Sequence, residues 1–552
     1  MIKQYNNITI DDIELVNQQS YIDFLRNGFK PRKDLPHYNI TQPIDWNIDP
    51  FSDSNWKFQL HSWRNLDPAI IEYKKHHDAS TLIFILDTMK SWFHFSIESK
   101  HSFLWYDMAV GLRAQKLGLL SNELITLSQN SSTDKEWIFK LIFSHLDELI
   151  DSEKFSLNNH GIFQAHGLMA LAKAFDFSST RCNKEISAIA LKRMSQLWSN
   201  QFYPEGIHSE NSPEYHIFAH RKFSKLAATN WYTSIRLDDA LLSAKRNFFW
   251  LCRPNSQIWP IGDSGISTLK IPEDILEHEL LFSPEHNEAN FKFFEQSGYF
   301  ISKSRDKEFG LFISTARRNK VHMHNDDLNF EWYDHGRPII VDSGKYGYTG
   351  CKYRKYYLSQ HAHNIILING ESINGSLYDS CLRRVGKMSY GTLVELSHKS
   401  IDHSIHNTRI LITKKSHFLI VIDRINSSSQ VTVEQTFHIH PNFSLENETE
   451  SNFDYSFIDI KDNLKINVRT LTNNAENNKS ILFGDTKNGF SFVSESYREQ
   501  KPSYLIKNSA SVKETVIATL FTTDSKYNIE VVDNVIYINN GSILIDKIDV
   551  NI

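Results

Sequence analysis

The sequence predicts an α+β protein in which an all-helical half is followed by an antiparallel β half. Through much of the first half, apolar residues recur at three- and four-residue steps, which is the spacing of an amphipathic helix. After about residue 295, short β-branched runs alternate with Asn, Gly and Ser turns, as is typical of antiparallel strands. Because 552 residues exceed one ordinary core, we expect more than one domain.

The helical pattern is clearest in three segments of the first half. Residues 82–93, 137–149 and 186–197 each place their apolar side chains on one face of a helix. Many such helices joined by short polar connections predict a bundle, a toroid or a solenoid. Residues 253–275 are rich in Pro, Gly and Ser, and they predict a loop region that ends the helical half.

The strand pattern is clearest in three segments of the second half. Residues 418–422 form a short β-branched run, and residues 431–439 partly alternate between apolar and polar side chains. Residues 531–541 predict two strands joined by a tight turn. Repeated short strands of this kind predict an antiparallel sandwich.

Composition narrows the range of partners. A formal net charge of -5 provides no global basic field, so we expect no non-specific binding of nucleic acid. No stretch approaches the ~18 consecutive apolar residues of a membrane span. A local basic cleft for an anionic substrate remains compatible with the sequence, because net charge does not describe how charges are distributed.

The cysteines and the N-terminus bear on the expected location. No signal sequence is visible at the start, so the chain as written is expected in the cytoplasm, or in the periplasm or outside the cell if a signal was removed. The cysteines are widely spaced and form no C-x-x-C pair, which predicts reduced thiols and neither a disulfide framework nor a Cys-zinc site. These cysteines are Cys182, Cys252, Cys351 and Cys381.

Two polar segments of the first half could carry chemistry. Asn159 and His160 lie in an Asn-Asn-His-Gly sequence just before a helical stretch, where Asn159 could equally be a helix cap. Residues 206–216 gather histidines, carboxylates including Glu210, and Tyr215 into one short segment. A tyrosine that begins a helix after a proline is also an ordinary core anchor.

A third polar segment, residues 321–326, contains the pair His322 and His324. In a strand these two histidines would point to the same face. One of them, together with Asp342 and His363, would give a plausible three-ligand zinc-type set. The alternative is a hydrogen-bonded polar cluster between strands.

The motifs from residue 322 to residue 370 resemble those of the heparinase II/III-like polysaccharide lyases, a family that includes oligoalginate lyases. In order, they are H-x-H-x-D, G-R-P followed by D-x-G, Y-x-Y and A-H-N. Residues 104–113 resemble the family's W-x-D…R helix, in which Arg113 is the arginine of the motif. The likeness extends over roughly residues 55–440.

This resemblance implies an incomplete α/α toroid followed by an antiparallel β-sandwich. The implied domains are an N-terminal extension at residues 1–50, a toroid catalytic domain at residues 51–290 and a sandwich at residues 291–552.

The implied reaction is β-elimination across C4–C5 of a uronic acid. Asn159, helped by His322 and His160, is expected to neutralise the substrate carboxylate. Tyr215 is expected to act as the base, the acid or both, with His160 as the alternative base. The further candidates are Tyr346, Tyr348, Tyr356, Tyr357, Glu210 and Arg113.

The resemblance also implies a divalent metal that holds the sandwich together rather than performing chemistry. The expected ligands are His324, Asp342 and His363, although the choice between His322 and His324 is open. Zinc suits two imidazoles and a carboxylate, with manganese and calcium as alternatives.

The expected partner is an anionic polysaccharide or oligosaccharide, with glycosaminoglycans such as heparan sulfate, chondroitin and hyaluronan ahead of alginate. A homo-oligomer is compatible with the sequence. One alternative function is a glycoside hydrolase on a similar helical toroid, with Glu210 and Asp263 as its paired carboxylates. The other is a polysaccharide-binding or assembly protein with a degenerate lyase site.

Overall fold

A computed structural model describes most of the chain, which divides into two compact units. Unit 1 comprises Met1–Gln201 and Arg221–Ala240, and unit 2 comprises Phe202–His220 and Leu241–Ile552. The described residues are 3–15, 17, 19–129, 135–178, 180–281, 289–315, 321–348, 350–371, 380–388, 391–400, 403–446, 452–473, 477–486 and 490–550.

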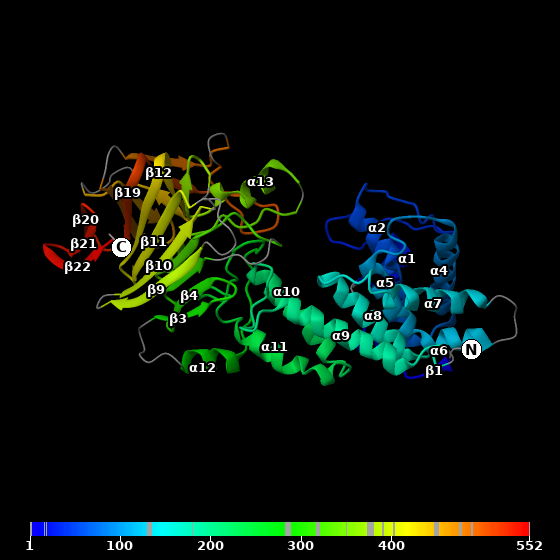
Figure 1. Cartoon of the computed structure of the whole chain (residues 1–552). Coiled ribbons are helices and arrows are strands. Elements are labelled where there is room, and N and C mark those ends of the chain that lie inside the picture. Colours follow the sequence, from blue (N-terminus) through cyan, green and yellow to red (C-terminus); the bar gives the residue numbers. More distant parts are fainter. Residues whose placement is uncertain are drawn as a thin grey trace. The chain divides into compact units, whose positions relative to one another are not determined.

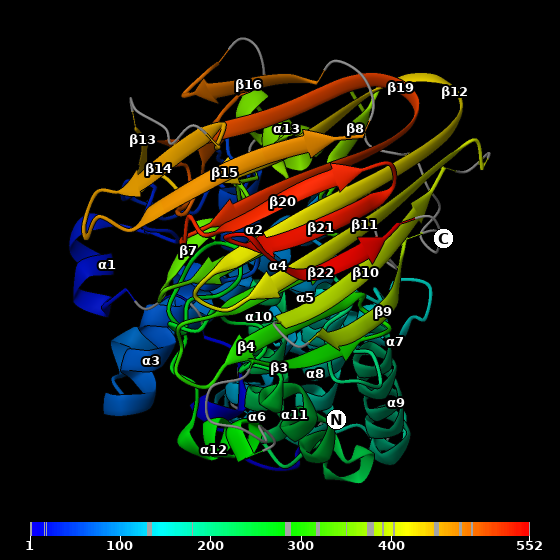
Figure 2. The same cartoon turned by 90° about the vertical axis from the view of Figure 1, so that its left-hand side faces the viewer.

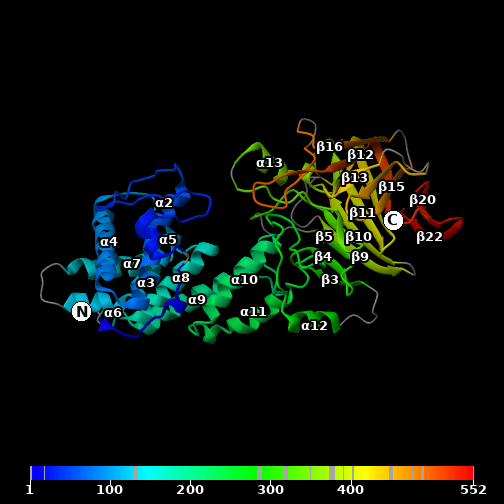
Figure 3. The ribbon, with the colours of Figure 1, turned by 180° about the vertical axis from the view of Figure 1, so that it is seen from behind.

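Unit 1 is helical (Figures 1 and 3). The short strands β1 (Lys3–Gln4) and β2 (Phe175–Asp176) pair with each other at its surface. Two further helices, α10 (Pro213–Ala227) and α11 (Leu237–Arg246), contribute residues to both units. The helices of unit 1 are α1 (Tyr21–Asn27), α2 (Ser54–His61), α3 (Asp67–His76), α4 (Ala79–Glu98), α5 (Asp107–Leu119), α6 (Ser121–Gln129), α7 (Glu136–Ile150), α8 (Asn159–Ala174) and α9 (Asn183–Gln201).

Helices α5 and α8 pack unusually close together. A Cβ atom at Gly111 would lie 2.3 Å from the Phe163 carbonyl oxygen, and one at Gly167 would lie 2.6 Å from the Gly111 oxygen. Only glycine lets two helix backbones approach this closely. The contact keeps the N-terminal ends of both helices on the same side of unit 1, since Asp107 at the start of α5 meets His160 at the start of α8.

The first residues of the chain belong to unit 1 and pack against its helices. The backbone N–H of Asn17 donates to Asp67 at 3.0 Å, and that carboxylate also meets the buried Lys116 ammonium at 3.1 Å. Lys222 of α10 forms an ion pair with Glu14. The predicted domain boundaries at residues 50 and 290 stay predictions.

Unit 2 is built on one large antiparallel sheet (Figure 2). Its main path among the described residues is β13-β14-β15-β19-β12-β7-β6-β5-β4-β3, and β8, β9, β10, β11 and β16 branch from it. The strands are β3 (Ala289–Phe294), β4 (Tyr299–Ser304), β5 (Gly310–Ser314), β6 (Phe330–Asp334), β7 (Arg337–Ile340), β8 (Ile366–Ile368), β9 (Cys381–Met388), β10 (Gly391–Lys399), β11 (Ile405–Lys414), β12 (Phe418–Ile439), β13 (Phe443–Leu445), β14 (Tyr455–Asp459), β15 (Lys465–Thr472), β16 (Asn478–Phe483) and β19 (Tyr504–Thr522).

Smaller elements complete unit 2. A three-stranded sheet lies over the main sheet in Figure 2, and two short strands form a separate pair. These elements are β20 (Tyr527–Val532), β21 (Val535–Asn540) and β22 (Ile543–Asp549) in the three-stranded sheet, β17 (Phe492–Val493) and β18 (Lys501–Pro502) in the pair, and the helices α12 (Glu273–Leu281) and α13 (Lys352–Leu358).

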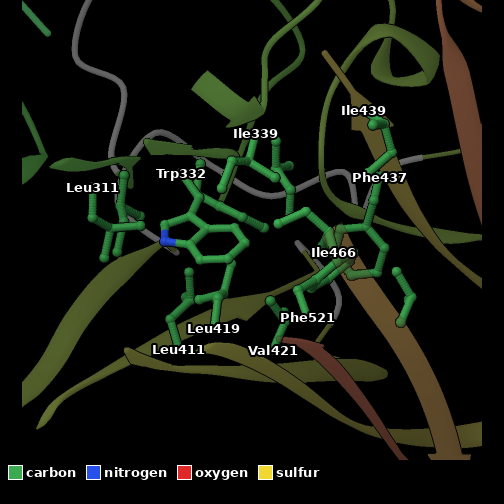
Figure 4. Close-up of a cluster of buried hydrophobic side chains, with 14 of the residues drawn as sticks. Leu311, Trp332, Ile339, Leu411, Leu419, Val421, Phe437, Ile439, Ile466 and Phe521 are labelled. Carbon is green, nitrogen blue, oxygen red and sulfur yellow. The ribbon is translucent and has the colours of Figure 1, made fainter. Parts of the chain in front are cut away.

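The main core of unit 2 surrounds the buried Trp332 of β6 (Figure 4). Leu311 of β5 and Ile339 of β7 pack in this core together with Leu411 of β11 and Leu419 of β12. The sheet therefore curves over so that strands from two parts of its path enclose one core.

The opposite face of the same strands is also buried. Ile410 and Ile412 of β11 pack with Ile529 of β20 and Ile536 of β21, while Leu411 between them faces the main core. Alternate side chains of a strand point to opposite faces. A strand that is buried on both faces must therefore be apolar throughout, which explains the continuous run at residues 418–422.

Most elements predicted from the pattern are present. Residues 82–93, 137–149 and 186–197 lie within α4, α7 and α9, and residues 531–541 span the turn between β20 and β21. Residues 418–422 and 431–439 belong to one strand, β12, rather than to two. Within the described residues, every helix is too short or too polar to cross a membrane.

Candidate active site and metal centre

A group of polar side chains gathers where several loops of unit 2 meet. Tyr215 lies in the first turn of α10, where the Ser212 hydroxyl accepts from the Tyr215 backbone N–H at 3.3 Å. The Tyr215 ring stacks on the His322 ring, with 3.6 Å between their centres and 22° between their planes. Its hydroxyl lies 3.0 Å from the Tyr348 hydroxyl. Three of the predicted site residues are therefore in direct contact.

The environment of Tyr215 favours the neutral phenol. Burial raises its pKa, and the nearby carboxylates of Asp263 and Glu210 raise it further, while the hydrogen bond with Tyr348 lowers it. Burial and the contact with Tyr215 also raise the pKa of Tyr348. Two protonated phenols side by side can pass a proton to a developing alkoxide, which suits general acid catalysis.

His322 is held on both of its ring nitrogens. Its Nδ1 lies 3.0 Å from Asp263 Oδ2, and its Nε2 lies 3.4 Å from Glu210 Oε2. Burial raises the pKa of Glu210, and the neighbouring His322 opposes that rise. His322 is therefore placed to exchange a proton at Nε2.

The predicted strand geometry of the pair His322 and His324 is wrong. Residues 321–326 lie outside any strand, and His322 has a φ of 54°, in the left-handed region. Gly262 approaches this turn so closely that a Cβ atom there would lie 2.9 Å from the His322 carbonyl oxygen and 2.3 Å from that of Asn211. A left-handed residue reverses the local direction of the chain, so the strand rule does not apply.

Asp263 connects the two histidines. His324 Nε2 donates to Asp263 Oδ1 at 3.0 Å, and Arg354 donates to both carboxylate oxygens at 2.5 and 2.8 Å. Burial would raise the pKa of Asp263, but the hydrogen bonds from His322, His324 and Arg354 outweigh burial and hold the pKa well below its usual range. Asp263 is therefore ionised, and its carboxylate accepts hydrogen bonds without donating any.

Sequence reasoning missed Arg354. It lies on α13, and its guanidinium carbon is 5.3 Å from the centre of the Tyr348 ring, close enough for a cation–π contact. Nothing in the residues around it distinguishes Arg354 from other arginines of the chain. Its position depends on a contact with Asp263, which lies 91 residues earlier.

A second buried group adjoins Asp263. His324, Asp342 and His363 each offer one ligand atom, and these atoms all lie within 4.8 Å of one another. His363 Nδ1 donates to Asp342 Oδ2 at 2.6 Å. Among the described residues, the buried Nδ1 of His324 has no hydrogen-bond partner. Two imidazoles and a carboxylate can bind a divalent metal, and of the two histidines it is His324, not His322, that belongs to this group.

Asp342 is oriented by its own hydrogen bonds. Asn329 donates to Asp342 Oδ2 at 2.6 Å, and the Asp342 backbone N–H donates to Glu331 Oε1 at 2.9 Å. Glu331 is in turn held by the buried Arg253. Burial opposes ionisation of Asp342, but His363 and His324 outweigh it and lower its pKa. The aspartate is therefore anionic, as a metal ligand must be.

Asn159 and His160 lie in unit 1. Asn159 is the first residue of α8, and the cap is Asn158, whose side chain accepts from the His160 backbone N–H at 2.8 Å, so the cap interpretation of Asn159 is wrong. His160 Nδ1 lies 3.1 Å from Asp107 Oδ1. Ser156 donates to Asp107 Oδ2 at 2.6 Å. Both predicted residues are half-buried.

Four of the remaining predicted candidates lie within packed cores. Arg113 is fully buried in unit 1, where it donates to His145 Nε2 at 2.9 Å and lies 4.1 Å from the centre of the Trp92 ring. In unit 2, a second cluster has buried Tyr356 and Tyr357 at its centre, with Tyr346 packed against them. These positions fit structural roles.

Two family models match the chain. One is described as Heparinase II/III N-terminus and covers residues 2–237, and the other as Heparinase II/III-like, C-terminal, and covers residues 286–527. No curated protein matches the chain by sequence.

The chain is also similar to solved structures. It matches the crystal structure of heparinase III with 17% identity and a TM-score of 0.71, over 98% of this chain and 93% of that chain. It matches the heparan sulfate lyase HepC from Pedobacter heparinus with 13% identity and a TM-score of 0.69, over 99% and 92%. These likenesses show the fold, a helical domain followed by a large antiparallel sheet domain, and the predicted fold class is confirmed.

Proposed function

Because the chain belongs to the heparinase II/III-like family, we propose that it is a polysaccharide lyase that cleaves uronic-acid-containing glycans by β-elimination. The observation that carries this proposal is the direct contact of Tyr215 with both His322 and Tyr348. A phenol held against an imidazole and a second phenol provides groups for proton removal and proton donation within one site.

In this reaction, a base removes the C5 proton of the uronic acid and the electron pair forms the C4–C5 double bond. The bond from C4 to its glycosidic oxygen then breaks, and that oxygen takes a proton from an acid. Negative charge grows on the substrate carboxylate as the C5 proton leaves, so it must be neutralised or hydrogen-bonded. We assign this task to Asn159, helped by whichever of His322 and His160 does not act as the base.

Tyr215 is the proposed acid, because its surroundings favour the protonated phenol. His322, whose Nε2 faces Glu210, and His160, whose Nδ1 faces Asp107, are the imidazoles available as the base. In the proposal, Tyr348 helps Tyr215 through the hydrogen bond between their hydroxyls.

We propose that His324, Asp342 and His363 hold zinc, with manganese and calcium as alternatives. When bound, the ion would fix three segments of unit 2 relative to one another and add positive charge beside Asp263. This role is structural, and every proton transfer proposed above uses the side chains of the chain itself.

The proposed substrates are glycosaminoglycans, followed by alginate. The two similar structures are described as heparinase III and as a heparan sulfate lyase, which supports testing heparan sulfate first. A panel of heparan sulfate, chondroitin, hyaluronan and alginate tests the proposal. New ultraviolet absorbance from the C4–C5 double bond supports the lyase, whereas new reducing ends without that absorbance identify a hydrolase, and binding without cleavage identifies a degenerate site.

The first prediction concerns the Tyr215 hydroxyl. We expect Tyr215→Phe to abolish turnover and to retain substrate binding, because the ring still stacks on His322 while the hydroxyl is lost. Steady-state kinetics and calorimetric titration with the same oligosaccharide measure the two effects. Tyr537→Phe, which removes a phenol hydroxyl from β21 in the three-stranded sheet, is the control. Near-wild-type turnover by Tyr215→Phe would remove Tyr215 from the mechanism.

A further inference from the structure

We infer that Asp263 is a positioning residue that orients His322 and His324 at the same time, and so links the proposed proton chemistry to metal binding. Its two carboxylate oxygens are divided between the two histidines: Oδ2 accepts from His322 Nδ1 and Oδ1 from His324 Nε2, each at 3.0 Å. The kinetic part of the inference rests on the proposed function, whereas the part that concerns His324 does not.

The hydrogen bonds to Asp263 fix which nitrogen of each ring carries a proton. A carboxylate can only accept, so each histidine must present an N–H to it. In His322 this places the proton on Nδ1 and leaves Nε2 as the nitrogen that can exchange a proton. Its Nε2 faces Glu210 Oε2 at 3.4 Å, on the opposite side of the ring from Asp263.

In His324 it is Nε2, not Nδ1, that faces Asp263, so the proton lies on the other ring nitrogen. The proton lies on Nε2, so Nδ1 carries the lone pair that a metal needs. This Nδ1 is buried and has no hydrogen-bond partner among the described residues, and His324 belongs to the group with Asp342 and His363. A carboxylate that accepts from the outer nitrogen of a ligand histidine fixes its ring orientation and strengthens it as a ligand.

Arg354 holds the carboxylate of Asp263 in this orientation. Its two terminal nitrogens donate to the two oxygens, so the carboxylate cannot rotate without breaking four hydrogen bonds. The side chain of Asp263 is 2% exposed, so water does not readily replace them. The neighbouring Gly262 brings the Asp263 backbone N–H to the His322 carbonyl oxygen at 3.1 Å, which anchors the two loops to each other.

Asp263→Asn tests the inference in the full chain. The amide has one acceptor oxygen in place of two, so it cannot serve both histidines and Arg354. We expect zinc affinity and kcat each to fall on the order of 10–100-fold, with KM largely unchanged. Zinc affinity is measured by competition with a chromogenic chelator, and the kinetics with the best substrate of the polymer panel. If Asp263 only neutralised Arg354, the variant would lose stability while zinc affinity and kcat stayed at wild-type values, which would overturn the inference.

Glu495→Gln is the matched control. Glu495 accepts from His440 Nε2 at 3.2 Å in the same unit, so the variant removes a carboxylate–imidazole contact that involves neither His322 nor His324. We expect its zinc affinity and kcat to match the wild type.

Arg354→Gln is a second variant in case Asp263→Asn does not fold. This variant leaves Asp263 and both histidines in place and removes the guanidinium that orients the carboxylate. We expect zinc affinity and kcat to fall, as in Asp263→Asn. Wild-type values of zinc affinity and kcat would contradict the inference. If the wild type cleaves no polymer, the proposed function fails, and the zinc measurement alone then decides whether Asp263 orients His324.

Discussion

At the residue scale, Gly262 has no room for a side chain. Its φ is 57°, and a Cβ atom would meet the backbone oxygens of Asn211 and His322. Both oxygens are backbone atoms rather than the ends of flexible side chains. Neither can move unless the loop that contains it also moves. A single methyl group at this position therefore acts directly on the backbone that carries His322.

We predict that Gly262→Ala lowers kcat by about 100-fold, because a misplacement of roughly 1 Å at a catalytic group has an effect of that size. The control is Gly370→Ala, where φ is 83° and the site of the new Cβ is open. Both variants bear the cost of a left-handed alanine, roughly 1–2 kcal/mol. Comparing kcat between Gly262→Ala and Gly370→Ala isolates the effect of the contact between the new Cβ and the backbone oxygens. Equal kcat values in the two variants would show that the loops adapt to the added methyl group.

At the element scale, the N-terminal ends of α5 and α8 are joined by Asp107. Burial would raise the pKa of this carboxyl, but hydrogen bonds from His160, Ser156 and the Met108 backbone outweigh burial and lower it. A carboxyl whose folded pKa is lowered contributes stability above its unfolded pKa and loses that contribution as the pH falls through the folded value.

Asp107→Asn should therefore lower the free energy of unfolding by roughly 1 kcal/mol at neutral pH, a value discounted for partial exposure. The difference from the wild type should be fully present above about pH 4, the usual Asp value, and should shrink below it. Urea titrations followed by circular dichroism at several pH values measure it. The control is Glu153→Gln, an exposed carboxylate in the loop before α8. A difference that grows on acidification would contradict this assignment.

The sequence predicts elements better than it predicts the site. Helical and strand periods identify α4, α7, α9 and β12, because each buries a regular face. The turn at His322 has no such signal: its residue is left-handed and lies against Gly262, 60 residues earlier in the chain. Arg354 could not be predicted for the same reason, because its partner Asp263 is distant in sequence. Motif order nevertheless predicted Tyr215 and His322, whose rings lie in contact, and the three buried residues that could bind a metal.

At the scale of the whole molecule, the candidate metal site lies in one of the two compact units. The candidate ligands His324, Asp342 and His363 all belong to unit 2. A ligand that binds only the folded state stabilises that state, by about 4 kcal/mol at a concentration 1,000 times its Kd. Two compact units can also unfold in separate transitions.

We therefore predict that zinc raises the unfolding temperature of the sheet unit and leaves that of the helical unit unchanged. Calorimetry with zinc and with a chelator measures the two transitions. Asp342→Asn, which removes a ligand, should abolish the response. A zinc-dependent shift confined to the helical unit would place the metal elsewhere.

The pairing of β12 with β19 also determines when unit 2 can fold on the ribosome. Phe418 at the start of β12 pairs with Thr522 at the end of β19. Synthesis proceeds from the N-terminus, so β12 emerges while its partner strand has not yet been made. The β12 edge that β19 later covers stays open throughout this interval, during which it can pair with other nascent chains. The yield of folded protein should therefore depend on how quickly the ribosome completes the segment between the two strands.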